Sequence, residues 1–359
     1  MEPSALIPPA DVLPVAPWLI RLLLDATFAA HILLMNVMFG LVLLGLVRSF
    51  RADASGDAAR MAGYIPNATA LTVNMAIPPL LFLQALYGQF FYVSSALMGV
   101  YWYGVALAVM AAYGLAYWQK ARLGREGSGR GGRGGLVWAL MAALLVFVSL
   151  AQTSNALLVI RPDLWTGHFE NPAGTLTSLN DPSFTPRWLH FVIASLAVGG
   201  LSLAMAGRKR VRRGESQGAR LIVEGMAWLG WATLAQIADG LWFLFAQPEA
   251  VRSAFLGGDA MATALVVVGV ALGGMTAAFA FTGRVVAGAA SLTATVAVMV
   301  VVRDIVRAMA LAPFHAMATH EVRPEYLTLV VFLACLIVTV VAVFWATRGI
   351  RVKAPQQEI

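Results

Sequence analysis

The sequence has little charge and almost no cysteine. Only 12% of its 359 residues are charged, whereas a soluble domain carries about 25%. Hydrophobic residues make up 60% of the chain, and the mean hydropathy is +0.77. One globular core cannot bury this much apolar surface, which excludes a soluble enzyme, a disordered chain and a secreted disulfide scaffold. The single cysteine, Cys335, excludes an intrachain disulfide, a cysteine-based zinc site and an iron–sulfur cluster.

Long apolar runs dominate what is present. A helix needs roughly 20 apolar residues to cross the hydrocarbon of a bilayer. The nine candidate stretches are Leu19–Val47, Ala68–Tyr92, Val100–Tyr117, Leu136–Ile160, Trp188–Ala206, Leu221–Phe245, Met261–Phe281, Val285–Val302 and Leu327–Trp345. Because they are continuous rather than alternating, they predict an all-α fold, a polytopic membrane helical bundle of about nine transmembrane helices. We treat residues 1–359 as a single bundle, with the first five helices in 19–206 and the last four in 221–345.

Lysine and arginine predict the orientation of these spans. Eighteen of the 25 lie in alternate loops or in the C-terminal tail, and these segments share one side if there are nine spans. By the positive-inside rule the N-terminus is outside and the C-terminus inside. The basic loops then need no nucleic-acid partner, because orientation and contact with anionic lipid headgroups explain them.

All five histidines fall in the outer half of the bundle or in the outer loops. His31 lies within the first span and His190 at the outer start of the fifth, while His168, His315 and His320 lie in outer loops. A neutral imidazole is a common ligand of haem iron. The alternative is a histidine that hydrogen-bonds to a nearby carbonyl or lies at a helix end.

Polar residues inside spans are costly and are functional candidates for that reason. Gln84, Asn155 and Asp239 lie toward the outer ends of their helices. Hydrogen bonding between helices explains amides such as Gln84 and Asn155, but a carboxylate such as Asp239 must pair or become protonated.

Two arginines close the eighth span at its outer end. Arg303 and Arg307 are four residues apart, so they share a helix face. Such a pair suits two carboxylates, for example two haem propionates. The alternative is a helix end whose arginines reach the interface, with Asp304 as a local partner.

Several segments together resemble subunit I of the cytochrome bd quinol oxidases, a family of nine-helix membrane proteins. The helix with Thr27–His31 resembles the family helix that carries a haem-ligating histidine, and Thr153–Leu157 is similar to a second family segment. Leu164–Pro172 and the run from Leu179–Pro182 to Trp188–His190 follow in the family's order. The resemblance covers roughly the first 205 residues and implies that His190 ligates a b haem. Small residues after His190 would leave space beside a flat macrocycle.

The sequence departs from this family at functional positions. Gln84 stands where the family has a glutamate on the proton path, and Arg303 stands where it has a haem-ligating glutamate. The long quinol-binding loop after the sixth helix is absent, since Ala246–Ala260 is short. An amide cannot titrate, so we expect no quinol:oxygen oxidoreductase activity in this short, divergent relative.

The first hypothesis is a haem-b-binding membrane subunit of a respiratory electron-transfer complex in a bacterial inner membrane. One or two haems would use His31 and His190, which we expect to reach a common cavity. Arg303 and Arg307 would hold propionates. Candidates for the second axial ligand are His315, His320 and Met299. Electrons would pass near the outer face to a c-type cytochrome or another membrane subunit, and quinone is a candidate substrate.

Two further hypotheses stay open. The chain could be a haem-free membrane anchor or scaffold derived from the same fold, which the lost glutamates favour. It could also be a transporter in which Asp239 and Asn155 act as a relay. Haem analysis separates the first two, and transport in liposomes tests the third.

Overall fold

The computed structural model describes residues 2–50, 55–126, 132–170, 172–315 and 320–349, and over these ranges helices dominate. The Gly-rich segment 127–135 is therefore described only from Gly132 onward. The long helices are α1 (Pro17–Ser49), α2 (Ser55–Leu97), α3 (Gly99–Glu126), α4 (Gly132–Ile160), α5 (Phe184–Val211), α6 (Gln217–Phe245), α8 (Ala260–Phe281), α9 (Val285–Leu311) and α10 (Tyr326–Gly349). The short ones are η1 (Pro3–Leu6), η2 (Pro162–Phe169), α7 (Glu249–Ser253) and the π-helical turn η3 (Ala254–Gly258).

The prediction of an all-helical polytopic bundle is confirmed. Over the described part of the chain, eight helices (α1 to α6, α8 and α9) are long and apolar enough to cross a membrane, and α10 contributes a shorter apolar stretch, Tyr326–Val338. The chain is therefore a multi-pass membrane protein. Each of the nine predicted spans falls within one of the nine long helices.

The largest difference from the predicted spans is at the start of α2. The segment before Ala68 was expected to be loop, but α2 already begins at Ser55. Met61, Ala62 and Ile65 are buried in a core with residues of α1 and α4, and this packing extends the helix beyond its apolar span.

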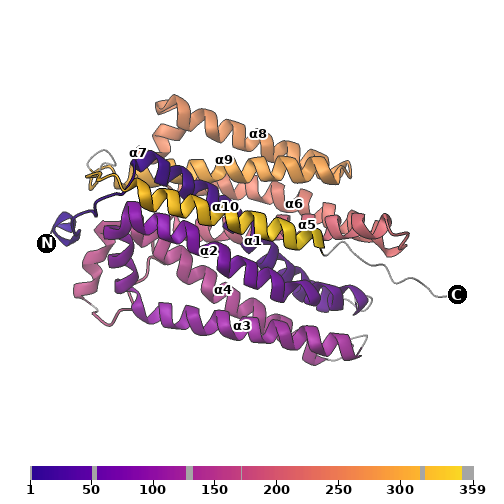
Figure 1. Cartoon of the computed structure of the whole chain (residues 1–359). Helices are drawn as coiled ribbons and strands as arrows, with labels where there is room; N and C mark the ends of the chain where they lie inside the picture. Colours follow the sequence, from indigo (N-terminus) through magenta and orange to yellow (C-terminus); the bar gives the residue numbers. More distant parts are fainter. Residues whose placement is uncertain (1, 51–54, 127–131, 171, 316–319, 350–359) are drawn as a thin grey trace.

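The long helices lie side by side along one direction (Figure 1). In this view α8 and α9 form one side of the bundle and α3 and α4 the other. η1 and the end of α10 lie at opposite ends, as an odd number of crossings requires. We call the end that carries η1, η2 and α7 the outer end, because the lysine- and arginine-rich loops are at the other end.

Close crossings of glycines place α5 at the centre. A methyl group at Gly40 of α1 would lie 1.9 Å from the Ser195 carbonyl oxygen of α5, and one at Gly225 of α6 would lie 2.4 Å from the Gly200 oxygen. Small residues let membrane helices approach this closely. Gly199 faces Gly40 and Gly200 faces α6, so these glycines serve helix crossings rather than leaving space for a macrocycle.

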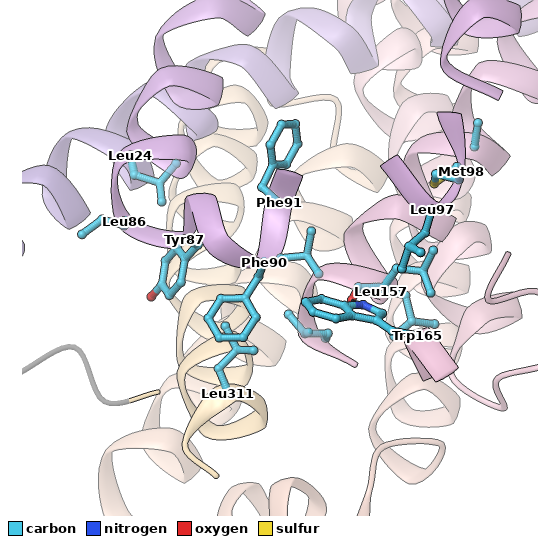
Figure 2. Close-up of a cluster of buried hydrophobic side chains, with 14 of the residues drawn as sticks. Leu24, Leu86, Tyr87, Phe90, Phe91, Leu97, Met98, Leu157, Trp165 and Leu311 are labelled. Carbon is cyan, nitrogen blue, oxygen red and sulfur yellow. Dashed lines mark hydrogen bonds between the residues drawn. The ribbon is translucent and has the colours of Figure 1, made fainter. Parts of the chain in front are cut away.

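An aromatic core fixes the outer end of α2 (Figure 2). α2 departs from helical geometry at Tyr87 (φ −136°, ψ 28°), and Phe90 after the break packs against Trp165 of η2. The Trp165 indole Nε1 donates to the Leu158 carbonyl oxygen at 2.9 Å. Leu311, at the end of α9, lies beside Phe90 in the same cluster (Figure 2). The break in α2, the loop helix η2 and α9 are thus held together.

Candidate functional site

The site is a cavity of about 280 Å³ in the half of the bundle formed by α5, α6, α8 and α9, with α1 closing one side. This volume is just below the usual range for ligand pockets, which is about 300–1,000 Å³. Its walls are mostly apolar, and glycines of α6 and α8 (Gly240, Gly269 and Gly273) reduce their thickness. A few polar side chains converge on it, as expected of a cofactor site. They are Asn36, Arg187, His190, Thr233, Gln236, Gln247, Thr276, Thr295 and Arg303.

His190 is held at the outer part of this cavity by two side chains of α6. Its Nδ1 lies 2.9 Å from Asp239 Oδ2, and Gln236 Nε2 donates to the His190 carbonyl oxygen at 3.0 Å. Asp239 is only 7% exposed. A carboxylate on Nδ1 fixes the tautomer that leaves Nε2 free as a ligand, an arrangement common behind metal-bound histidines. The carboxylate expected to need a partner thus has one.

Arg187 is one helical turn before His190 on α5 and lines the same cavity. It is 8% exposed, and its guanidinium lies 4.8 Å from the centre of the Phe243 ring. Its Nε and Nη2 have no hydrogen-bond partner within the described chain. Buried N–H groups without partners are costly, so this position suits an anionic group of a ligand.

Arg303 enters the cavity from α9, and its guanidinium lies 4.3 Å from the centre of the Phe28 ring. Met299, one turn before it, lines the cavity as well. The Met299 methyl occupies a notch at Gly269, where an added Cβ would lie 2.0 Å from it. Arg303 and Met299 therefore present a cation and a thioether to the same space as His190.

Arg307 does not line this cavity, although it was expected to act with Arg303. Its Nη1 donates to Asp304 Oδ1 at 3.2 Å, and its guanidinium lies 5.1 Å from the centre of the Tyr87 ring. Asp304 is also bonded by Arg21 of α1. Arg307 therefore matches the alternative given above, an arginine at a helix end with Asp304 as its local partner. Arg303 does not, because it lines the cavity.

His31 is not among the residues that line the cavity. Phe28, Ile32 and Asn36 of α1 face it instead, and His31 lies on a neighbouring face of that helix. Its Nδ1 is buried with no hydrogen-bond partner in the described chain. Of the two histidines that were expected to share a cavity, His190 lines this one and His31 does not.

Gln84 and Asn155 also lie outside the cavity lining. Asn155 is 4% exposed, and its Nδ2 lies 3.4 and 3.3 Å from the hydroxyls of Ser94 and Ser95 on α2. This is the interhelical hydrogen bonding that was considered as an alternative for the amides. Asp239 pairs with His190, so it and Asn155 have different hydrogen-bond partners.

His315 and His320 contact each other, with 3.0 Å between their Nε2 atoms, and neither lines the cavity. Burial, and then the neighbouring His320, lower the pKa of His315 below its ordinary value of 6.5. Of the candidates for a second ligand beside His190, the cavity contains Met299. Among the residues that the structure describes, no three His, Cys, Asp or Glu side chains converge as a metal site.

Sequence reasoning missed the role of Arg187 and the partner of Asp239. The spacing held a signal, because Arg187 and His190 are three residues apart on one helix, as are Gln236 and Asp239 on another. Residues three apart share a helix face. The sequence therefore indicates that each pair of polar side chains lies on one face of its helix. It does not indicate that the two pairs meet, because nothing in the sequence says which helices are neighbours.

No protein-family model and no curated protein sequence matches this chain. Its fold does match a chain in a structure described as "The structure of bd oxidase from Geobacillus thermodenitrificans", with a TM-score of 0.70 and 13% sequence identity. This chain shares its fold with that bd oxidase chain. The match covers 94% of this chain and 98% of the other, so the two are nearly equal in length. A bd-like fold was expected from motifs in the first 205 residues, and it extends over the last four helices too. At this identity the likeness establishes the fold alone, and function is argued from the site.

Proposed function

We propose that this chain is a haem-b-binding membrane subunit of a respiratory electron-transfer complex. The observation that carries the proposal is Arg187, a buried arginine with two unpartnered nitrogens beside an imidazole that a carboxylate supports. Haem b brings the same two requirements, an axial ligand for its iron and cations for its propionates.

The residues of the cavity divide into roles. His190 would ligate through Nε2, because Asp239 occupies its Nδ1. Met299 is the candidate for the second axial ligand, since it lines the same cavity from α9. Arg187 and Arg303 would bind the propionates. The bound haem would supply one-electron transfer, and the apolar walls would keep water from it.

The fit supports one haem rather than two. A second haem at His31 would need a pocket of its own, because His31 lies outside the cavity described above. Oxygen reduction is not part of the proposal, because Gln84 cannot deliver protons and lies away from the cavity.

The site is near the outer end, since Arg187 and His190 lie in the first two turns of α5 and Arg303 in the last third of α9. Electron exchange with an outer partner, a c-type cytochrome or another membrane subunit, is therefore part of the proposal. So are quinone as an electron source and the bacterial inner membrane as the location. The haem-free scaffold is the second candidate, favoured by the absence of His31 from the cavity lining and by Arg303 in the place of a family glutamate.

The deciding experiment is haem analysis of the purified subunit. We expect a pyridine haemochrome spectrum of b type, about one haem per chain, and a reduced-minus-oxidised spectrum with a Soret change. Haem supplied during expression should not raise the ratio above one. Protein that stays folded in detergent and carries no haem after such supplementation would establish the scaffold instead.

A further inference from the structure

A second arrangement of nitrogen ligands lies at the outer end, apart from the cavity. His315 follows α9, and His320 lies before α10. Their Nε2 atoms are 3.0 Å apart, their ring centroids are 4.7 Å apart, and the ring planes meet at 76°. His320 is only 8% exposed.

These two distances show how the rings are aimed. A straight N–H···N hydrogen bond over this distance would hold the centroids more than about 5 Å apart, because each nitrogen lies about 1.1 Å from its own centroid. The centroids are closer than that, so at least one ring is inclined to the line that joins the two nitrogens. If the two ring axes meet, the point lies about 2 Å from each nitrogen, which is the usual Zn–N distance.

A main-chain oxygen lies beside one of these two nitrogens. α2 departs from helical geometry at Tyr87, and the carbonyl oxygen of the preceding residue, Leu86, lies 3.2 Å from His320 Nε2. Adjacent ligands of a four-coordinate metal ion lie about this far apart, since each is about 2 Å from the ion. The broken helix therefore supplies a third candidate ligand.

Each nitrogen of His320 faces a main-chain oxygen, so a neutral ring can donate to only one of the two. His320 Nδ1 lies 3.3 Å from the Asp11 carbonyl oxygen, which can only accept a hydrogen bond. With the proton on Nδ1, the Nε2 of neutral His320 carries a lone pair. That lone pair faces the Leu86 oxygen, another acceptor, even if His315 donates a proton to it. A cation at the common point satisfies all three ligand atoms at once, and Nδ1–H bonded to a carbonyl is the usual support of a metal-bound histidine.

We propose that His315 Nε2, His320 Nε2 and the Leu86 carbonyl oxygen bind one divalent transition-metal ion, with water completing the coordination. Imidazole nitrogen with one oxygen suits Zn²⁺ among the common ions. The ion would join the break in α2 to the connection between α9 and α10. The N-terminal segment is attached to that connection too, since Leu13 N donates to the Glu321 oxygen at 2.9 Å and Arg323 N to the Leu13 oxygen at 2.9 Å.

The test is a zinc titration of the full chain, purified without a histidine tag and stripped with a chelator. Calorimetry should give one Zn²⁺ per chain, and Co²⁺ should give the visible absorption of a four-coordinate nitrogen–oxygen site. His315→Ala should weaken zinc binding at least tenfold and remove the Co²⁺ absorption. The matched control is His168→Ala, another outer-loop histidine, which should bind zinc as the wild type does.

His320→Ala also removes contacts to two main-chain oxygens, so His315→Ala decides the test, with circular dichroism to show that the variant is folded. Wild-type protein that binds no zinc stoichiometrically would overturn the proposal and leave a proton shared by the two histidines. Unchanged zinc binding by folded His315→Ala would overturn it as well. Neither result depends on haem, so the proposed function stands or fails separately.

Discussion

His190 and His31 are both half-buried in the outer halves of their helices, but their surroundings differ. The Asp239 carboxylate pairs with His190 Nδ1, the Gln236 side-chain amide donates to the His190 main-chain carbonyl oxygen, and the His190 side chain lines the cavity. His31 has Phe28 as a ring neighbour at 6.4 Å and a buried Nδ1 with no partner in the described chain. Two histidines at similar depth can therefore have different surroundings. Under the proposed function, the carboxylate that fixes the tautomer of His190 is the feature that would make it a ligand and leave His31 a packed histidine.

The largest expected effect tests this comparison directly. His190→Ala should abolish the Soret band, because the ligand that Asp239 supports is gone. His31→Ala should keep haem content and spectrum close to those of the wild type. Haem-to-protein ratios of the two purified variants provide the measurement. Equal loss of haem in both would mean that His31 is a ligand and that the comparison is wrong.

Arg187→Gln should come next in size. A hydrogen bond to a charged group contributes about 1.5–3 kcal/mol, which corresponds to haem retention weaker by about ten- to a hundredfold. Transfer of haem to an apo-globin scavenger measures this retention. Arg307→Gln is the control, because Arg307 bonds Asp304 outside the cavity and Arg21 remains as a partner for that carboxylate. Similar haem loss from both variants would show that the effect is general destabilisation.

Asp239→Asn should weaken haem retention by about tenfold, as is typical for the partner of a ligating histidine. The midpoint potential of the haem should rise, because an amide accepts a weaker hydrogen bond than a carboxylate and leaves the imidazole less electron-rich. Redox titration followed at the Soret band measures the potential. A variant with wild-type potential and retention would show that Asp239 only fills space behind His190.

Met299→Leu is expected to have the smallest effect on retention and the clearest effect on the spectrum. Leucine has a similar volume but no sulfur, so haem should stay bound while the ferrous form becomes five-coordinate and binds carbon monoxide. Absorption spectra with and without carbon monoxide test this. An unchanged low-spin spectrum would exclude Met299 as the second axial ligand.

Much of the fold was predictable because membrane helices are specified locally. Each apolar run, such as Val285–Val302, needs only its own composition to become a span, since lipid replaces a tertiary partner. The start of α2 was predicted too late, because residues 55–67 become helical through packing of Met61, Ala62 and Ile65 against other helices. That packing has no signature in hydropathy.

The site was predicted in part. His190 and Arg303 were proposed from their residue types and positions, and both line the cavity. Arg307 lies about 40° further around α9 than Arg303, by the ordinary helical repeat, and this difference directs it to Asp304 and Tyr87. Residues that share a helix face in the sequence can therefore have different neighbours. Arg187 was overlooked because a basic residue near the start of a span looks like an interfacial one.

The sequence by itself determined that this protein spans a membrane, where its long helices other than α2 begin within about a turn, and which polar residues lie near the outer face. These properties follow from local composition and from the cost of placing charge in lipid. Only the tertiary structure decided that His190 meets Asp239, that Arg187 and Met299 face one cavity, and that His31 does not. The reason is that the close glycine crossings of α1, α5 and α6 set which helix faces meet, and each helix sequence leaves its rotation about its own axis undetermined.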